Sequence, residues 1–128
     1  MLEGVGSLVR RDVPNILLSH NPNTFNRAAE LGIELSLAGH THGGQIQVEI
    51  LDHRLSPARF MTPYVAGLYA RPLLADTANA GDTHYQWLSL DRQAALSHIY
   101  VNRGLGTVGA PVRLGVPPEI TLIVLRRA

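Results

Sequence analysis

Short apolar runs and one helical pattern alternate along the first forty residues of the chain. The run over 13–20, "VPNILLSH", predicts a buried strand. The segment 21–32, "NPNTFNRAAELG", predicts a helix, because Asn21 is a good N-cap and a proline follows it at the first helical position. The run over 33–39, "IELSLAG", predicts a second buried strand. Strand, helix and strand with short connections form a βαβ unit, so we expect the two strands to run parallel.

Strands are predicted to dominate the remainder of the chain. Polar and apolar residues alternate over 43–51, and the other predicted strands cover 64–69, 97–104 and 118–127. A loop is expected over 52–63. The segment 70–96 fits neither period and is expected to be mostly an irregular insertion. The pattern therefore predicts an α/β, β-rich protein with one βαβ unit near its N-terminus.

Length and composition indicate one domain whose surface is poor in charged residues. The 128 residues suit a single domain, and a hydrophobic content of 45% is enough for a core. Only 16% of the residues are charged, which is low for a free-standing domain. We therefore expect a large part of the surface to contact something other than water. The net charge of +1 carries no signal for a nucleic-acid partner.

Two residue types are missing, and each absence excludes a class of chemistry. The chain has no lysine, which excludes a P-loop lysine and a Schiff-base lysine. It has no cysteine, which excludes disulfides, thiolate zinc sites and a cysteine nucleophile. No apolar run approaches the ~18 residues that a membrane span needs. Any membrane association is therefore expected to come through a segment that is not in this chain.

The stretch "LAGHTHGGQ" (37–45) carries the strongest chemical signal in the sequence. His40 and His42 are two residues apart just after a predicted strand, so their rings can reach one small region. The flanking glycines allow tight turns and a close approach to a ligand. His20 ends the neighbouring parallel strand. Neutral imidazole is a common metal ligand, so these three side chains predict a metal site at the carboxyl edge of the sheet.

Other polar residues invite simpler interpretations. His53, His84 and His98 lack flanking glycines and partners, so we expect them to be ordinary histidines. Arg103 follows a predicted strand and precedes two glycines, which suits either a phosphate contact or a surface arginine at a tight turn. The case for Arg113 is weaker. Thr41 is expected to orient its loop, Asn21 to cap the helix, and Gln45 to hold the backbone after the glycines.

Five motifs together resemble a known family. They are "LLSHNP" (17–22), "GHTHGGQ" (39–45), "YVAGLY" (64–69), "YVNRGLGT" (100–107) and "PVRLGVPPEITLIVL" (111–125). In this order they resemble the C-terminal half of a calcineurin-like metallophosphoesterase, of the bacterial branch that is often tethered to the membrane. The resemblance implies that residues 1–128 are the C-terminal part of one four-layer α/β/β/α sandwich, with 70–96 as a variable insertion.

The resemblance also implies a reaction and a place in the cell. Two divalent metal ions, such as Mn, Fe or Zn, would activate a hydroxide for in-line attack on a phosphate ester. By resemblance, His20 and His40 would bind one ion and His42 the other. The same resemblance implies the bacterial cytoplasm or its membrane as the location.

The family's N-terminal motifs have no usable counterpart in this sequence. An Asp-x-His, a Gly-Asp and a Gly-Asn-His motif supply its carboxylate, amide and remaining histidine ligands, whereas "GDTHY" (81–85) lies in the wrong part of the chain. Two cations held close together by neutral ligands alone would repel each other. The chain is therefore expected to be a fragment whose partner is the missing N-terminal half, and to self-associate when alone. Two alternatives stay open: a domain with one metal ion on three histidines, and a non-catalytic remnant.

Overall fold

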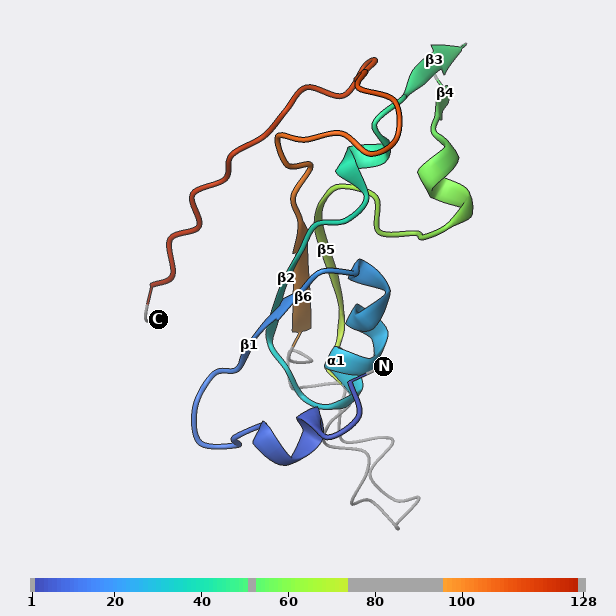
Figure 1. Ribbon diagram of the computed structural model, residues 1–128. Coiled ribbons are helices and arrows are strands. Elements are labelled where there is room, and N and C mark those ends of the chain that lie inside the picture. Colours follow the sequence, from blue (N-terminus) through green and yellow to red (C-terminus); the bar gives the residue numbers. More distant parts are fainter. Residues whose placement is uncertain (1, 51–52, 74–95, 127–128) are drawn as a thin grey trace.

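The computed structural model describes residues 2–50, 53–73 and 96–126, and its centre is a four-stranded sheet (Figure 1). The strand order is β1-β2-β6-β5, and β3 and β4 form a separate antiparallel pair. The bounds are β1 Ile16–Ser19, β2 Leu35–Ala38, β3 Val48–Ile50, β4 His53–Leu55, β5 Gly67–Pro72, β6 Leu96–Val101 and α1 Phe25–Glu30. Four short 3-10 turns cover Val5–Leu8, Pro22–Thr24, His42–Gly44 and Pro57–Phe60.

The predicted βαβ unit is confirmed. Strands β1 and β2 pair in parallel from Ile16 opposite Leu35 to Ser19 opposite Ala38, with α1 between them in the chain. The helical segment is divided into a 3-10 turn and α1. Asn21 caps it as predicted, because its side chain accepts a hydrogen bond from the backbone N–H of Asn23 at 2.9 Å.

The core lies between α1 and one face of the sheet. Phe25 is fully buried and packs with Ala38 of β2 and with Ile99 and Val101 of β6. Tyr64 contacts Phe25 edge to face, with ring centroids 5.3 Å apart. The α/β class is confirmed, and the mixed sheet with few helices is consistent with part of the sandwich that the resemblance implied.

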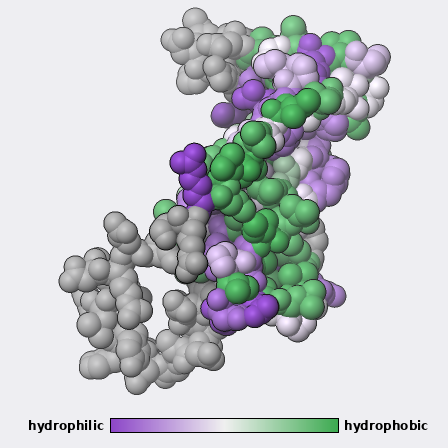
Figure 2. Space-filling view, turned by 90° about the vertical axis from the view of Figure 1, so that its left-hand side faces the viewer, coloured by the Kyte–Doolittle hydropathy of each residue, from purple (hydrophilic) through white to green (hydrophobic). Residues whose placement is uncertain are grey.

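The expectation that β1 is buried is wrong. Leu18 is 77% exposed and Ile16 is 48% exposed, because α1 covers only one face of the sheet and β1 lies at its edge. Apolar side chains gather in a band on the side of the molecule where β1 and the C-terminal segment lie (Figure 2). This surface is consistent with the low charge content of the sequence.

The predicted strand over 118–127 is also wrong for the residues that are described. Residues 118–126 belong to no strand, and Leu122 is 88% exposed. The segment descends as an extended chain on the left of the picture, and near its start Thr121 is hydrogen-bonded to Tyr100 and Asn102 (Figure 1). A strand needs a neighbour for its backbone hydrogen bonds, and nothing within 2–50, 53–73 and 96–126 lies beside this segment as a ladder partner.

Several other boundaries differ from the predictions. The expected loop over 52–63 contains β4 and the 3-10 turn Pro57–Phe60, and the strand expected over 64–69 begins only at Gly67. The ends of the expected insertion 70–96 belong to β5 and β6. Residues 74–95, with His84 and the "GDTHY" motif, lie outside the described residues. Where the chain is described, no helix is long and apolar enough to cross a membrane.

Candidate metal centre

The rings of His20 and His40 meet at the carboxyl edge of the parallel strands. His20 directly follows β1, and His40 comes two residues after the end of β2. Nδ1 of His40 lies 2.8 Å from Nε2 of His20, and the two rings meet edge to face with centroids 4.5 Å apart. Both residues are exposed to solvent. The parallel pairing of the strands therefore brings these two predicted site residues together, although they are twenty positions apart in the sequence.

The backbone after β2 turns sharply, and several residues adopt left-handed conformations to allow this. His40 has φ 71° and His42 has φ 50°, values that non-glycine residues adopt at a cost of about 1–3 kcal/mol each. Thr41 holds the turn, since its hydroxyl donates to the carbonyl of Val65 at 2.6 Å and accepts from the N–H of Gly43 at 3.3 Å. This agrees with the orienting role expected for Thr41.

The two glycines of the motif are required by close packing. A Cβ at Gly43 would lie 2.7 Å from Val116 and 2.8 Å from Arg103. A Cβ at Gly44, where φ is 86°, would lie 2.1 Å from the hydroxyl oxygen of Ser56. The flanking segments thus pack directly on the backbone of the turn.

His42 contacts a different partner from the other two histidines. Its Nδ1 lies 3.0 Å from the carbonyl oxygen of Gly106, in the loop that follows β6. A carbonyl only accepts hydrogen bonds, so Nδ1 of His42 carries a proton, and in the neutral ring the lone pair is on Nε2. The described residues contain no group of three or more histidine or carboxylate side chains arranged to hold a metal ion.

Two side chains that sequence reasoning undervalued hold the loop after β6. The buried amide of Gln45 donates to the carbonyls of Val108 at 3.1 Å and Ala110 at 2.8 Å. Arg113 donates to the carbonyls of Arg103 at 2.8 Å and of Gly106 at 2.5 Å. The Gln45 contacts span 63 and 65 positions, and the Arg113 contacts span ten and seven positions within an irregular loop, so neither set follows a local pattern.

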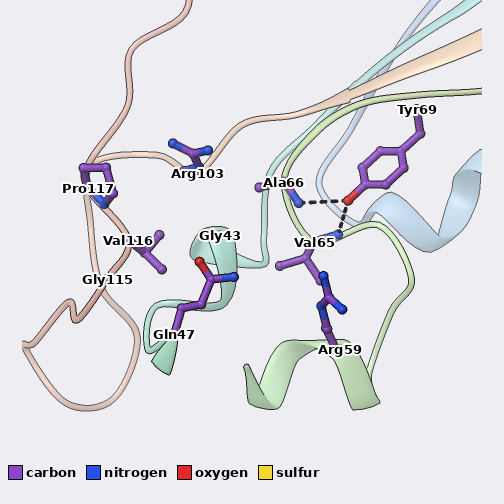
Figure 3. A pocket seen from close by; sticks show the side chains of 10 residues that line it. All are labelled: Gly43, Gln47, Arg59, Val65, Ala66, Tyr69, Arg103, Gly115, Val116 and Pro117. Carbon is purple, nitrogen blue, oxygen red and sulfur yellow. Dashed lines mark hydrogen bonds between the residues drawn. The ribbon is translucent and has the colours of Figure 1, made fainter. Parts of the chain in front are cut away.

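Arg103 lines a cavity of about 420 Å³ beside the motif. Gly43, Arg59 and Val116 also line it, and the two arginines lie on opposite sides of the glycine (Figure 3). On its far side, the hydroxyl of Tyr69 accepts hydrogen bonds from the backbone N–H groups of Val65 and Ala66.

Arg103 also contacts a carboxylate, with Nε 3.5 Å from Glu119. Burial opposes ionisation of Glu119, but the hydrogen bonds from Thr121 and Tyr100 and the charge of Arg103 together outweigh it, so the pKa of Glu119 is lowered. The C-terminal segment is therefore fixed at its start, next to β6.

The remaining histidines lie elsewhere in the fold. His98 lies in the middle of β6, opposite Leu35 of β2 and Ala70 of β5, and His53 lies in β4. Their assignment as ordinary histidines stays a prediction.

The chain is similar to several proteins that are named metallophosphoesterases or phosphodiesterases. The chain is 32% identical over 124 residues to the uncharacterized metallophosphoesterase YkuE of Bacillus subtilis, covering 97% of this chain and 35% of that protein. It is 31% identical over 114 residues to the phosphodiesterase YaeI of Escherichia coli, covering 89% of this chain and 33% of that protein. It is also 34% identical over 120 residues to a cattle transmembrane protein with a metallophosphoesterase domain, covering 91% of this chain and 21% of that protein.

The chain thus spans about a third of the length of these two bacterial relatives. No protein-family model and no solved structure matches it. The motifs in the sequence, the mixed α/β sheet and these relatives agree: the chain is the C-terminal part of a metallophosphoesterase-like domain.

Proposed function

We propose that this chain supplies histidine ligands to a two-metal phosphoester hydrolase. The observation that carries the proposal is the contact between His20 and His40 at the carboxyl edge of the sheet. Parallel sheets bind ligands at this edge, and a metallophosphoesterase-like domain implies divalent metal ions as cofactors. In this proposal His20 and His40 hold one ion and His42 belongs to the other.

The donor atoms suit a divalent ion. Two imidazole nitrogens bound to one tetrahedral ion lie about 3.4 Å apart at ordinary bond lengths. The facing nitrogens of His20 and His40 are 2.8 Å apart, so a small ring rotation would open room for an ion between them. On His42 the nitrogen left without a proton is Nε2, which is therefore the ligand atom. Two bound ions would polarise the phosphoryl group and activate water for in-line attack.

The proposal requires carboxylates that the described residues do not bring to this edge. Neighbouring cations repel strongly unless an anionic ligand lies between them. We place those ligands in a preceding part of the domain, the N-terminal half expected from the resemblance. The greater length of the relatives supports this, since the matched region is about a third of each bacterial one.

The proposed substrate is a phosphate ester, with Arg103 as a phosphate contact. Its guanidinium lines the cavity next to Gly43, and Arg59 brings a second positive charge from the opposite side. Arginine suits phosphate because its planar N–H groups can donate to two oxygens at once. In this state Arg103 pairs with Glu119, so a bound phosphate would compete with that carboxylate.

Calorimetric titration of the chain with Zn²⁺ and with Mn²⁺ tests the proposal. We expect weak binding that the double substitution His20→Gln and His40→Gln abolishes. The matched control, His98→Gln, removes an imidazole from the middle of β6 and should leave binding unchanged. Equal binding by the double variant and the wild type would contradict the proposal.

The same titration separates the two alternatives. One tight zinc site per chain, together with hydrolysis of an activated ester, would favour a domain with a single metal ion. Inactivity that persists after the N-terminal half is added would favour a non-catalytic remnant.

A further inference from the structure

We propose that Arg113 is a positioning residue that fixes the tautomer of His42 through the carbonyl of Gly106. The inference rests on the proposed function, because it concerns the histidine assigned to the second metal ion. It extends that function by explaining how a ring in a glycine-rich loop presents its Nε2 atom, and not Nδ1, to a ligand.

The guanidinium of Arg113 donates only to main-chain carbonyl oxygens among the residues described. Nη2 lies 2.8 Å from the carbonyl oxygen of Arg103, 3.0 Å from that of Gly104 and 2.5 Å from that of Gly106, so one of its two N–H groups is shared between two carbonyls. Nε donates to Gly106 at 3.1 Å, and Nη1 to the carbonyl of His42 at 3.4 Å. Arg113 therefore joins the motif turn to the loop after β6, using a rigid fork of donors that lysine lacks.

The carbonyl of Gly106 is the point where this network meets the imidazole. It accepts from two guanidinium nitrogens of Arg113 and also faces Nδ1 of His42 at 3.0 Å. With the proton on Nδ1, this third contact is a hydrogen bond. With the proton on Nε2, two lone pairs would face each other, which is unfavourable. The position of this carbonyl therefore selects the tautomer.

Arg113 is what holds that carbonyl in place. Residues 104–110 contain three glycines, and Gly104 and Gly109 have positive φ values of 66° and 69°, so the loop has little conformational preference of its own. Gln45 fixes the loop at Val108 and Ala110, two or more residues beyond Gly106. Partners of this kind orient metal-binding histidines and fix which ring nitrogen is free.

Nitrogen NMR of the histidine rings tests the inference without any metal. The 15N-labelled chain is measured at about pH 8.5, where ordinary imidazoles are neutral, and His42 is assigned from the signals lost in His42→Gln. We expect wild-type His42 to hold its proton on Nδ1 alone. In Arg113→Gln we expect a mixture of both tautomers, and in Arg113→Lys an intermediate population, because an ammonium reaches fewer carbonyls.

Two controls separate positioning from a general loss of structure. Arg11→Gln changes an exposed arginine near the N-terminus, far from Arg113 in the sequence, and should leave the His42 ring signals unchanged. The ring signals of His20 and His40 should keep their positions in every arginine variant. If Arg113→Gln fails to fold, the wild-type spectrum and Arg113→Lys decide the matter alone.

The outcomes distinguish this inference from the proposed function. A wild-type His42 with its proton on Nε2, or an unchanged tautomer in Arg113→Gln and Arg113→Lys, would overturn the inference. The tautomer is read without metal, so it is independent of the zinc titration that tests His20 and His40. If the tautomer changes as expected but the His20→Gln, His40→Gln variant binds zinc as well as the wild type, this inference stands and the proposed function fails.

Discussion

The side-chain amide of Gln45 pairs with the backbone of Val108 in both directions. Its Nε2 donates to the carbonyl of Val108 at 3.1 Å, and its Oε1 accepts from the N–H of Val108 at 2.7 Å. The residues are 63 positions apart, so one side chain fixes the loop after β6 against the motif turn. Because Gln45 is only 8% exposed, water cannot easily replace these bonds.

Replacing Gln45 by Glu should therefore destabilise the chain. An ionised carboxylate cannot donate, and it would face the carbonyl oxygens of Val108 and Ala110 in a buried site. We expect the free energy of unfolding in urea to fall by about 2–3 kcal/mol at pH 7. The control is Gln47→Glu, which makes the same change at a partly exposed residue on the cavity wall. Equal losses in the two variants would contradict the role assigned to Gln45.

The close approach at Gly44 predicts a steric effect that goes beyond backbone strain. Gly44→Ala would place a Cβ 2.1 Å from the hydroxyl oxygen of Ser56, whereas Gly109 has a similar positive φ and open space around it. Gly109→Ala should cost about 1–2 kcal/mol of unfolding free energy from its φ alone, and Gly44→Ala clearly more. Adding Ser56→Ala to Gly44→Ala should recover part of the difference, and an absence of recovery would refute the contact.

The lowered pKa of Glu119 predicts how stability changes with acidity. Ionised Glu119 stabilises the folded chain, because its folded pKa lies below the unfolded value of 4.5. This contribution is fully present above that value and is lost as the pH falls through the folded pKa. Wild type should thus be more stable than Glu119→Gln at pH 6, and the difference should shrink below about pH 4.5. Chemical unfolding across this range measures the difference, and a gap that widens on acidification would contradict the assignment.

The apolar band on the β1 side predicts self-association. Leu18 and Leu122 are both mostly exposed, and contiguous apolar surface of this kind favours association. Light scattering should show particles larger than a monomer, and the double substitution Leu18→Glu and Leu122→Glu should reduce their size. A wild-type chain that stays monomeric at high concentration would refute the prediction.

The local patterns of the sequence predicted the parts of the structure that local interactions determine. The strand at 16–19, the Asn21 cap and the strand at 35–38 each follow from neighbouring residues, and parallel pairing then brings His20 to His40. The predictions are wrong where the conformation of a segment depends on a partner that is distant in the sequence. Alternation and apolar residues over 118–127 are typical of a strand, but no neighbouring strand is described to pair with it.

The candidate site was predicted only in part for the same reason. The sequence predicts that His20, His40 and His42 share one site. The rings of His20 and His40 are in contact, while the bond from His42 to Gly106 spans 64 residues and has no sequence signal. The sequence makes only a weak case for Arg113 as a phosphate contact, and in the structure its donors are directed to carbonyls of the loop. The roles of Gln45 and Arg113 depend on tertiary contacts that only the folded chain provides.

The measurement that bears most directly on the metal centre is ring nitrogen NMR during zinc titration of the wild-type chain. The facing nitrogens, Nε2 of His20 and Nδ1 of His40, should both shift as metal is added, at the same stoichiometry, while the ring of His98 stays unchanged. If zinc leaves the His20 and His40 nitrogens unaffected, or shifts all histidines alike, these two residues do not hold a common ion.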